Sequence, residues 1–148
     1  MFKKIVVGLD GSENSENALR MACDIGKKYG SEIHLVYIVH PETVGIAVGA
    51  VAGFHAATTM ETAEEIKAVG EKLLASGAAI AKDCGYDDTK AHMYSGKPAD
   101  QILECAEECG ADLIVTGRRG LGAVGSLLLG STTQRVNKLA KCACLSIA

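Results

Sequence analysis

The sequence has few of the features that mark linkers, secretion or membrane insertion. It contains two prolines in 148 residues, which argues against a proline-rich linker. The N-terminal residues Met1–Ile5 lack the long apolar stretch and the cleavage site of a signal peptide, so we expect a cytoplasmic protein. The uncharged segment 43–60 is flanked by Glu42 and Glu61 instead of basic anchors, and we expect no membrane span there.

An excess of positive charge is also absent from the chain as a whole. The formal net charge is −3 and the pI is about 5.8, which argues against nucleic acid as a partner. All the acidic residues lie within 1–112, whereas every charged residue within 113–148 is basic. These are Arg118, Arg119, Arg135, Lys138 and Lys141. The C-terminal part of the chain is therefore expected to tolerate or attract an anion.

Metal and redox motifs are missing from the cysteine pattern. The pairs Cys105/Cys109 and Cys142/Cys144 have neither CxxC spacing nor a histidine at zinc-ligand spacing. We therefore predict no metal site, and we interpret the six cysteines as small buried residues in a reducing compartment.

The length and apolar content fit one folded domain. Hydrophobic residues make up 48% of the 148 residues and charged residues 22%, so we expect a single domain over residues 1–148. Residues 41–60 show neither helical nor strand periodicity, and we predict a long, variable loop there.

Apolar runs alternate with helical stripes along the chain. The runs predict strands at 5–9, 33–39, 89–95, 112–116 and 143–147. The stripes predict helices over 12–29, 62–84, 98–109 and 131–140, the last opened by a capping box of Ser131 and Gln134. In the second helix the stripe consists of Ile66, Val69, Leu73, Gly77, Ile80 and Cys84. This alternation predicts a doubly wound, five-stranded parallel sheet with helices on both faces and a ligand site beyond the carboxyl ends of the strands.

A glycine-rich loop follows the fourth predicted strand, over residues 117–130. Glycine lets the backbone approach a ligand closely, and successive free N–H groups can surround a phosphate. The loop leads into a helix N-terminus with hydroxyls at Ser131 and Thr132, and Arg118 and Arg119 supply positive charge. These features indicate a polyphosphate site. The alternative is a surface turn whose glycines serve packing, and the sequence has neither the Walker lysine nor a GxGxxG after the first strand.

The spacing Gly117-x2-Gly120-x9-Gly130-Ser131 resembles the nucleotide-binding signature of the universal stress protein A (UspA) family, in its ATP-binding branch. The Asp-Gly-Ser turn at residues 10–12 and the Gly-Lys-Pro segment at 96–98 fall in the order expected for that family. The resemblance covers residues 3–148 and implies a Rossmann-like fold with strand order 3-2-1-4-5.

The resemblance also implies a ligand and an assembly. The ligand is ATP, alone or with Mg²⁺, and the assembly is a homodimer formed by pairing the last strand with its copy. Leu9 and Asp10 would border the adenosine, and Ile38 would pack on the adenine. The residues implied to hold ribose and phosphates are Gly117, Arg118, Arg119, Gly120, Leu121, Gly122, Ala123, Gly130, Ser131, Thr132 and Thr133. The chain departs from the family at Cys144, where the last strand usually has proline.

Several functions are compatible with this fold. The first hypothesis is a regulatory ATP-binding module with little or no turnover. An ATP-hydrolysing or adenylyl-transferring enzyme is the alternative, but Asp10 is the only acid at a predicted strand end facing the site, and we assign no catalytic residue. A phospho-receiver is rejected because its acidic cluster and acceptor aspartate are missing. The intact glycines argue against a partner-binding protein with an empty loop.

Overall fold

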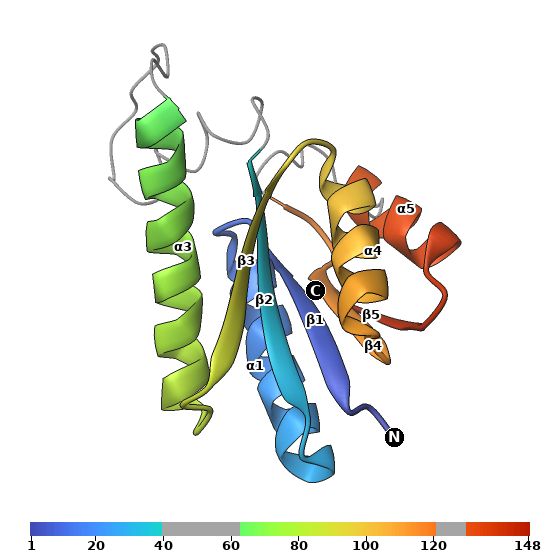
Figure 1. Ribbon diagram of the computed structural model, residues 1–148. Helices are drawn as coiled ribbons and strands as arrows, with labels where there is room; N and C mark the ends of the chain where they lie inside the picture. Colours follow the sequence, from blue (N-terminus) through green and yellow to red (C-terminus); the bar gives the residue numbers. More distant parts are fainter. Residues whose placement is uncertain (40–62, 121–129) are drawn as a thin grey trace.

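The structure is a computed structural model that describes residues 1–39, 63–120 and 130–148. Strands and helices alternate along these residues as the sequence predicts (Figure 1). The strands are β1 (Lys4–Leu9), β2 (Glu32–Val39), β3 (Thr89–Ser95), β4 (Leu113–Gly117) and β5 (Ala143–Ile147). The helices are α1 (Glu13–Tyr29), α3 (Ala63–Asp83), α4 (Pro98–Cys109) and α5 (Ser131–Leu139). The loop predicted at 41–60 lies outside the described residues.

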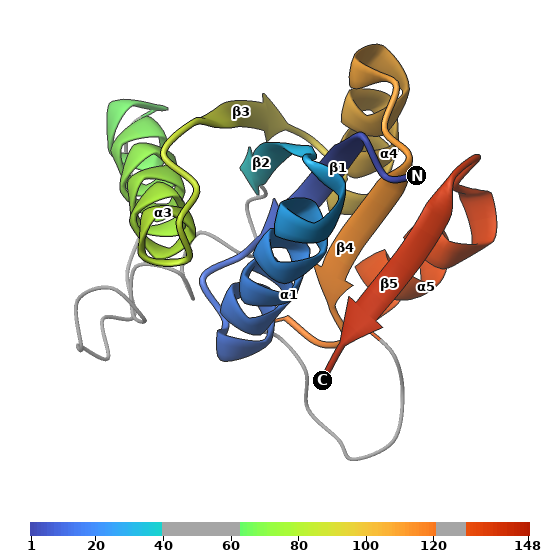
Figure 2. The same cartoon turned by 90° about the horizontal axis from the view of Figure 1, so that it is seen from below.

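The five strands form one parallel sheet in the order β3-β2-β1-β4-β5, which confirms the predicted strand order. Helices α1 and α3 cover one face, and α4 and α5 cover the other, as the view along the sheet in Figure 2 shows. The chain winds from β1 outward to β2 and β3, then crosses to β4 on the opposite side of β1. Winding therefore reverses between β1 and β4, where ligands bind in sheets of this kind.

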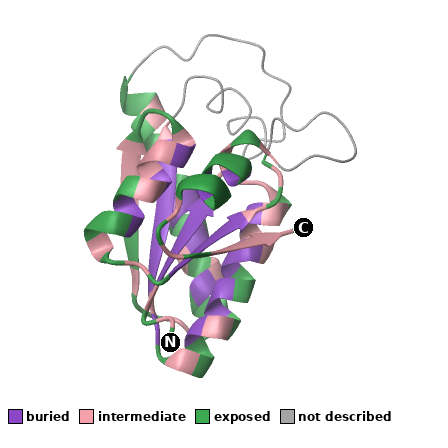
Figure 3. Cartoon of the chain, turned by 90° about the vertical axis from the view of Figure 1, so that its right-hand side faces the viewer, coloured by how far each residue is buried: buried purple, intermediate pink, exposed green. Residues whose placement is uncertain are grey.

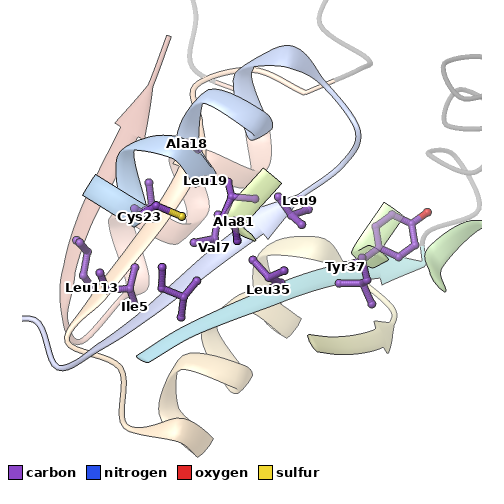
Figure 4. Close-up of a cluster of buried hydrophobic side chains, with 14 of the residues drawn as sticks. Ile5, Val7, Leu9, Ala18, Leu19, Cys23, Leu35, Tyr37, Ala81 and Leu113 are labelled. Atoms are coloured by element: carbon purple, nitrogen blue, oxygen red, sulfur yellow. The ribbon is translucent and has the colours of Figure 1, made fainter. Parts of the chain in front are cut away.

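The core lies along the three central strands, which appear as buried segments in Figure 3. All residues of the run Ile5–Leu9 are buried, because helices cover both faces of β1. One cluster packs these strands against α1 and α3 (Figure 4), and a second packs them against α4 and α5. The edge strands β3 and β5 are only partly buried. Within the described residues, no helix has the length and apolar character needed to cross a membrane.

Cap residues account for most helix boundaries. The Ser12 side chain accepts a hydrogen bond from the Ser15 backbone N–H at the start of α1, and Gly30 ends this helix in the left-handed conformation. Pro98 opens α4 in its first turn, and Gly110 closes it. These boundaries confirm the sequence prediction for both helices.

The predicted capping box at the start of α5 is wrong. The N-cap is Gly130, Ser131 is the first helical residue, and no side chain caps this end of the helix. The backbone explains the shift, because Gly130 N–H donates to the Arg118 carbonyl (2.9 Å) and Gln134 N–H donates to the Gly130 carbonyl (2.9 Å). The N-cap of α5 therefore lies one residue earlier in the chain than the side-chain pattern predicts.

The buried face of α3 also differs from the predicted stripe. Leu73 and Gly77 are buried as predicted, but Ile66, Val69, Ile80 and Cys84 are only partly covered. The remaining buried positions of the helix are Gly70, Leu74 and Ala81. Two of these three residues are small, which lets α3 approach the sheet closely. A β-carbon on Gly77 would lie 2.6 Å from Leu9 Cδ1, and one on Gly70 would lie 2.8 Å from Met93 Sδ.

Candidate functional site

The turn after β1 fixes the orientation of Asp10. Asp10 Oδ1 accepts hydrogen bonds from Ser12 N–H (2.9 Å) and from the Ser12 hydroxyl (2.6 Å). Between them Gly11 adopts a φ of +82°, a conformation that side-chain-bearing residues rarely take. The Asp10 carboxylate is therefore held at the carboxyl end of β1 by its own turn, with Oδ2 lying against Gly120.

The segment after β4 packs against this turn and against the start of α1. A β-carbon on Gly117 would lie 2.9 Å from the Asn14 carbonyl carbon, and one on Gly120 would overlap the Asp10 carboxylate. The Asn14 side-chain amide donates to the Arg119 carbonyl at 3.4 Å. Gly117 and Gly120 thus both have a packing role, which was the alternative explanation for the glycines of this loop.

The start of α5 is bonded to the same segment. The Thr133 hydroxyl, which is 3% exposed, donates to the Gly117 carbonyl at 2.8 Å. The bond from Gly130 N–H to the Arg118 carbonyl adds a second link. Gly130 has a φ of −58°, and a β-carbon there would make only ordinary contacts, the nearest at 3.5 Å from the Arg118 carbonyl oxygen. Neither backbone strain nor crowding within the described residues therefore requires glycine at position 130.

The N-terminus of α5 differs electrostatically from the other helix starts. The first turns of α1, α3 and α4 carry acidic residues, whereas the first turn of α5 has no acid and no side-chain cap. Ser131 is exposed and Thr132 is half-buried at this end. Backbone N–H groups of a first helical turn have no intrahelical partner, and the helix dipole favours an anion beside them.

Ion pairs with α4 neutralise two of the five basic residues in the C-terminal part of the chain. Arg135 Nε lies 2.7 Å from Asp100 Oδ1, and Lys141 Nζ lies 2.9 Å from Glu107 Oε1. Within the described ranges no carboxylate pairs with Arg118 or Arg119. Lys138 lies in the last turn of α5, so the charge next to the start of this helix is that of the two arginines.

Arg118 and Arg119 differ in their surroundings. Arg118 is exposed, whereas Arg119 is half-buried and its buried Nε has no hydrogen-bond partner among the described residues. A buried guanidinium N–H without an acceptor is costly, so an acceptor arriving beside Arg119 would be stabilising.

Leu9 and Ile38 lie on opposite faces of the sheet. The Leu9 side chain is 8% exposed and belongs to the cluster with α1 and α3, so only its backbone reaches the strand end (Figure 4). Ile38 is 6% exposed and packs in the cluster on the α4 side. Three further predicted residues, Leu121, Gly122 and Ala123, lie outside the described residues.

Sequence reasoning missed two residues near this end of the sheet. Asn14 holds the Arg119 carbonyl, and no motif in the sequence marks it for that role. Tyr37 is 2% exposed and its hydroxyl is buried without a hydrogen-bond partner, toward the carboxyl end of β2 (Figure 4). Burial raises the pKa of the Tyr37 hydroxyl, and the nearby charge of Asp10 raises it further.

The cysteines and other metal-ligating residues form no metal centre in the described part of the chain. There, no three residues among His, Cys, Asp and Glu gather into a group able to hold a metal ion. All six cysteines are free thiols; Cys23 and Cys105 are buried, and the other four are partly covered.

Comparisons of sequence and of structure match this chain to one family over nearly its whole length. The model of the universal stress protein family matches residues 1–147. A universal stress protein of Methanocaldococcus jannaschii is 35% identical over 150 residues, covering 99% of this chain and 82% of the relative. A universal stress protein crystallised in complex with cAMP superposes with a TM-score of 0.74 at 24% identity, covering 99% of this chain and 97% of that one. The Archaeoglobus fulgidus universal stress protein in complex with dAMP superposes with a TM-score of 0.68 at 19% identity, covering 100% and 98%.

The shared fold defines the class first: a five-stranded, all-parallel α/β protein with strand order 3-2-1-4-5. Together with the family match, this result settles the family. The chain belongs to the universal stress protein family.

Proposed function

We propose that this protein binds ATP at the carboxyl ends of β1 and β4, as a member of the ATP-binding branch of its family. The observation that carries the proposal is the start of α5, which has no acid and no cap and is bonded to the segment after β4. Unpaired Arg118 and Arg119 lie on that segment, so backbone N–H groups and positive charge meet at one place. The complexes of related proteins with cAMP and dAMP support an adenine nucleotide as the ligand.

Each part of the site has a separate proposed role. The glycines of the signature and residues 121–123 let the backbone reach the phosphates, and Ser131, Thr132 and Thr133 offer donors at the helix start. Asp10 and the Leu9 backbone border the adenosine, with Asp10 Oδ2 as acceptor for a ribose hydroxyl. Ile38 offers an apolar surface to the adenine. If Mg²⁺ accompanies the nucleotide, Asp10 is the carboxylate that would face it.

We propose that the bound nucleotide serves regulation, with little or no turnover. Phosphoryl transfer needs a positioned base or nucleophile and metal-binding carboxylates around the phosphates. Of the strand ends that the structure describes, only that of β1 is directly followed by an acid, Asp10. The competing function is an ATP-hydrolysing or adenylyl-transferring enzyme on the same fold.

The proposed biological unit is a homodimer of one-domain chains in the cytoplasm. Strand β5 lies at an edge of the sheet, and an unpaired edge is a template for pairing with another chain. A two-fold axis beside β5 would pair it with its own copy in antiparallel fashion.

Calorimetry with ATP tests the site, and Gly130→Val is the sharpest variant. A β-carbon at this position would make only ordinary contacts with the described residues, so a loss of affinity in a folded variant reports interference with ligand approach. We expect ATP affinity to fall at least about tenfold, or about 1.4 kcal/mol, while Lys138→Ala on the same helix leaves it unchanged. Equal ATP affinity in wild type and Gly130→Val would refute this site.

Two further measurements separate the two functions. Mass spectrometry of ligand released from the purified protein identifies the nucleotide that it carries. A steady-state assay with ATP should show negligible turnover. A sustained rate near ~10 s⁻¹ that is abolished by Asp10→Asn would favour the enzyme.

A further inference from the structure

A chain of hydrogen bonds links two histidines on neighbouring strands, on the sheet face that also carries α4. His34 Nδ1 of β2 lies 2.9 Å from His92 Nε2 of β3, and His34 Nε2 lies 2.6 Å from Glu32 Oε1. Lys90 Nζ lies 3.2 Å from the other carboxylate oxygen of Glu32. His34 is 4% exposed, and the two imidazole rings are nearly parallel, with an interplanar angle of 14°.

The carboxylate fixes the tautomer of His34. A bare Nε2 lone pair facing Glu32 at 2.6 Å would be repelled, so Nε2 carries the hydrogen and donates to Glu32 Oε1. Neutral His34 then has a lone pair on Nδ1, and His92 donates its Nε2–H to that lone pair. The contact between the strands thus requires one imidazole of the pair to keep an unprotonated nitrogen.

Protonation acts on this contact in two steps. A first proton can enter at His92 Nδ1, which leaves both hydrogen bonds in place. A second proton would put N–H groups on both facing nitrogens, which lie 2.9 Å apart, and would bring two cations together. The second proton can therefore enter only after His34 and His92 separate.

The groups around His92 together oppose its protonation. Burial is the main factor that lowers the pKa of His92 below its ordinary value of 6.5, and His34 and Lys90 lower it further. Glu108 of α4 acts in the opposite direction. Tyr94, stacked beside His92 with ring centroids 6.3 Å apart, donates its hydroxyl to Glu108 at 2.9 Å and so engages this carboxylate.

We propose that the His34–His92 contact makes the attachment of edge strand β3 sensitive to protons. While both imidazoles are neutral, the contact is fully formed. As the pH falls, any state in which the pair is apart can bind one more proton than the closed state and gains population relative to it. One extra proton corresponds to an increase of about tenfold per pH unit in that population ratio. Acidification thus loosens β3 at its contact with β2 while the central strands keep their hydrogen bonds.

Amide hydrogen exchange as a function of pH tests the proposal on the whole protein. Protection factors, corrected for the intrinsic pH dependence of exchange, are compared for β3 and for β4 between pH 7.5 and 5. We expect protection in β3 to fall by up to about tenfold per pH unit below 6.5, with β4 unchanged as the internal control. In His92→Gln the side-chain amide still donates to His34 but does not titrate, so the decline should flatten.

A histidine-ring NMR titration of the wild type provides a readout that does not depend on the variant folding. We expect the His92 signals to titrate with a pKa below that of a free imidazole, and the His34 signals to change together with them because the two rings share a hydrogen bond. His92 titrating as a free imidazole with no response from the His34 signals, or β3 protection that does not change with pH, would overturn the proposal. The same decline in wild type and in a folded His92→Gln protein would also overturn it.

Discussion

The Asp10 carboxylate lies against Gly120, where it occupies the space that a β-carbon would need, so the turn after β1 contacts the segment after β4 there. Both segments leave the sheet at its carboxyl end, on either side of the place where the winding reverses. Two hydrogen bonds from Ser12 hold the carboxylate, which therefore cannot retreat without losing them. This contact fixes the separation between the two halves of the proposed ATP site.

The first prediction concerns Gly120→Ala. The added methyl group overlaps the Asp10 carboxylate, so we expect a loss of about 1–3 kcal/mol in unfolding free energy, typical of overpacking, together with weaker ATP binding. Asp10→Ala in the same chain should relieve the overlap. Urea unfolding of both single variants and the double variant should then give a coupling energy of at least about 0.5 kcal/mol. Gly130→Ala is the matched control and should stay within about 0.5 kcal/mol of wild type. Additive effects of the two substitutions would contradict the contact.

The second prediction concerns the link between α5 and β4. Thr133→Val keeps the shape of the side chain but removes the hydroxyl that donates to the Gly117 carbonyl. Because Thr133 is buried, we expect a loss of about 1–3 kcal/mol in unfolding free energy. Thr133→Ser keeps the donor and should recover most of this loss. Thermal or urea unfolding measures both variants, and equal stability of the valine and serine proteins would contradict the assigned bond.

The third prediction concerns acid stability. Asp112 Oδ2 accepts hydrogen bonds from the backbone N–H groups of Lys3 (2.7 Å) and Lys4 (3.1 Å), and these bonds lower the pKa of its carboxyl below 3.8. A lowered pKa means that the charged form stabilises the folded state above about pH 4 and that this stability is lost as the pH falls further. Asp112→Asn should therefore flatten the fall in urea midpoint below pH 4. Asp88→Asn, in the turn before β3, is the charge-matched control and should keep the wild-type slope.

The fourth prediction concerns the proposed dimer. Ala143 N–H donates to the Asp112 carbonyl, and Arg118 N–H donates to the Ile147 carbonyl, so the odd-numbered residues of β5 bond to β4. In a parallel pair, the backbone N–H and C=O groups of the even-numbered residues point away from the partner strand. The N–H of Ser146 therefore lies on the free edge of β5. Ser146→Pro should therefore disrupt β5–β5 pairing and shift the protein toward monomer, while Ser146→Ala stays dimeric.

Sedimentation under reducing conditions measures this shift, since all six cysteines are free and cross-linking must be prevented. A folded Ser146→Pro protein that remains fully dimeric at low micromolar concentration would place the interface elsewhere. By the same alternation, the backbone N–H of Cys144 also points to the free edge. Proline, which the family usually has at this position, would leave the bonds to β4 intact.

The strands and both boundaries of α1 and α4 were predictable because their signals are local. A buried strand is an unbroken apolar run, and Ser12, Gly30, Pro98 and Gly110 carry cap preferences in their own chemistry. The helix α5 was predicted from Ser131 onward, but its N-cap was not predictable, because the bond from Gly130 N–H to the Arg118 carbonyl joins residues far apart in the sequence. The buried face of α3 was also missed in part: the predicted stripe contained Gly77 but not Gly70, Leu74 or Ala81, because the helix turns small residues toward the sheet that a stripe of large apolar residues does not mark.

In the candidate site, too, local patterns could be predicted from the sequence, whereas contacts between distant residues could not. The family signature selects Asp10 and the glycines, but their mutual contacts depend on positions far apart in the sequence. No pattern marks Asn14 as the partner of Arg119, and none reveals that Arg135 is paired with Asp100. The number of basic residues in the sequence therefore overestimates the positive charge that is available to a ligand at the site.

The glycines of α3 affect how a mutational map of this protein should be interpreted. Gly77 lies against Leu9, the last residue of β1, and Gly70 lies against Tyr37 near the end of β2. A larger residue at either position pushes on a strand end, and a shift of Leu9 carries Asp10 with it. A screen for lost nucleotide binding would therefore recover substitutions in α3 that never contact the ligand, and these would identify the support of the site instead of its lining.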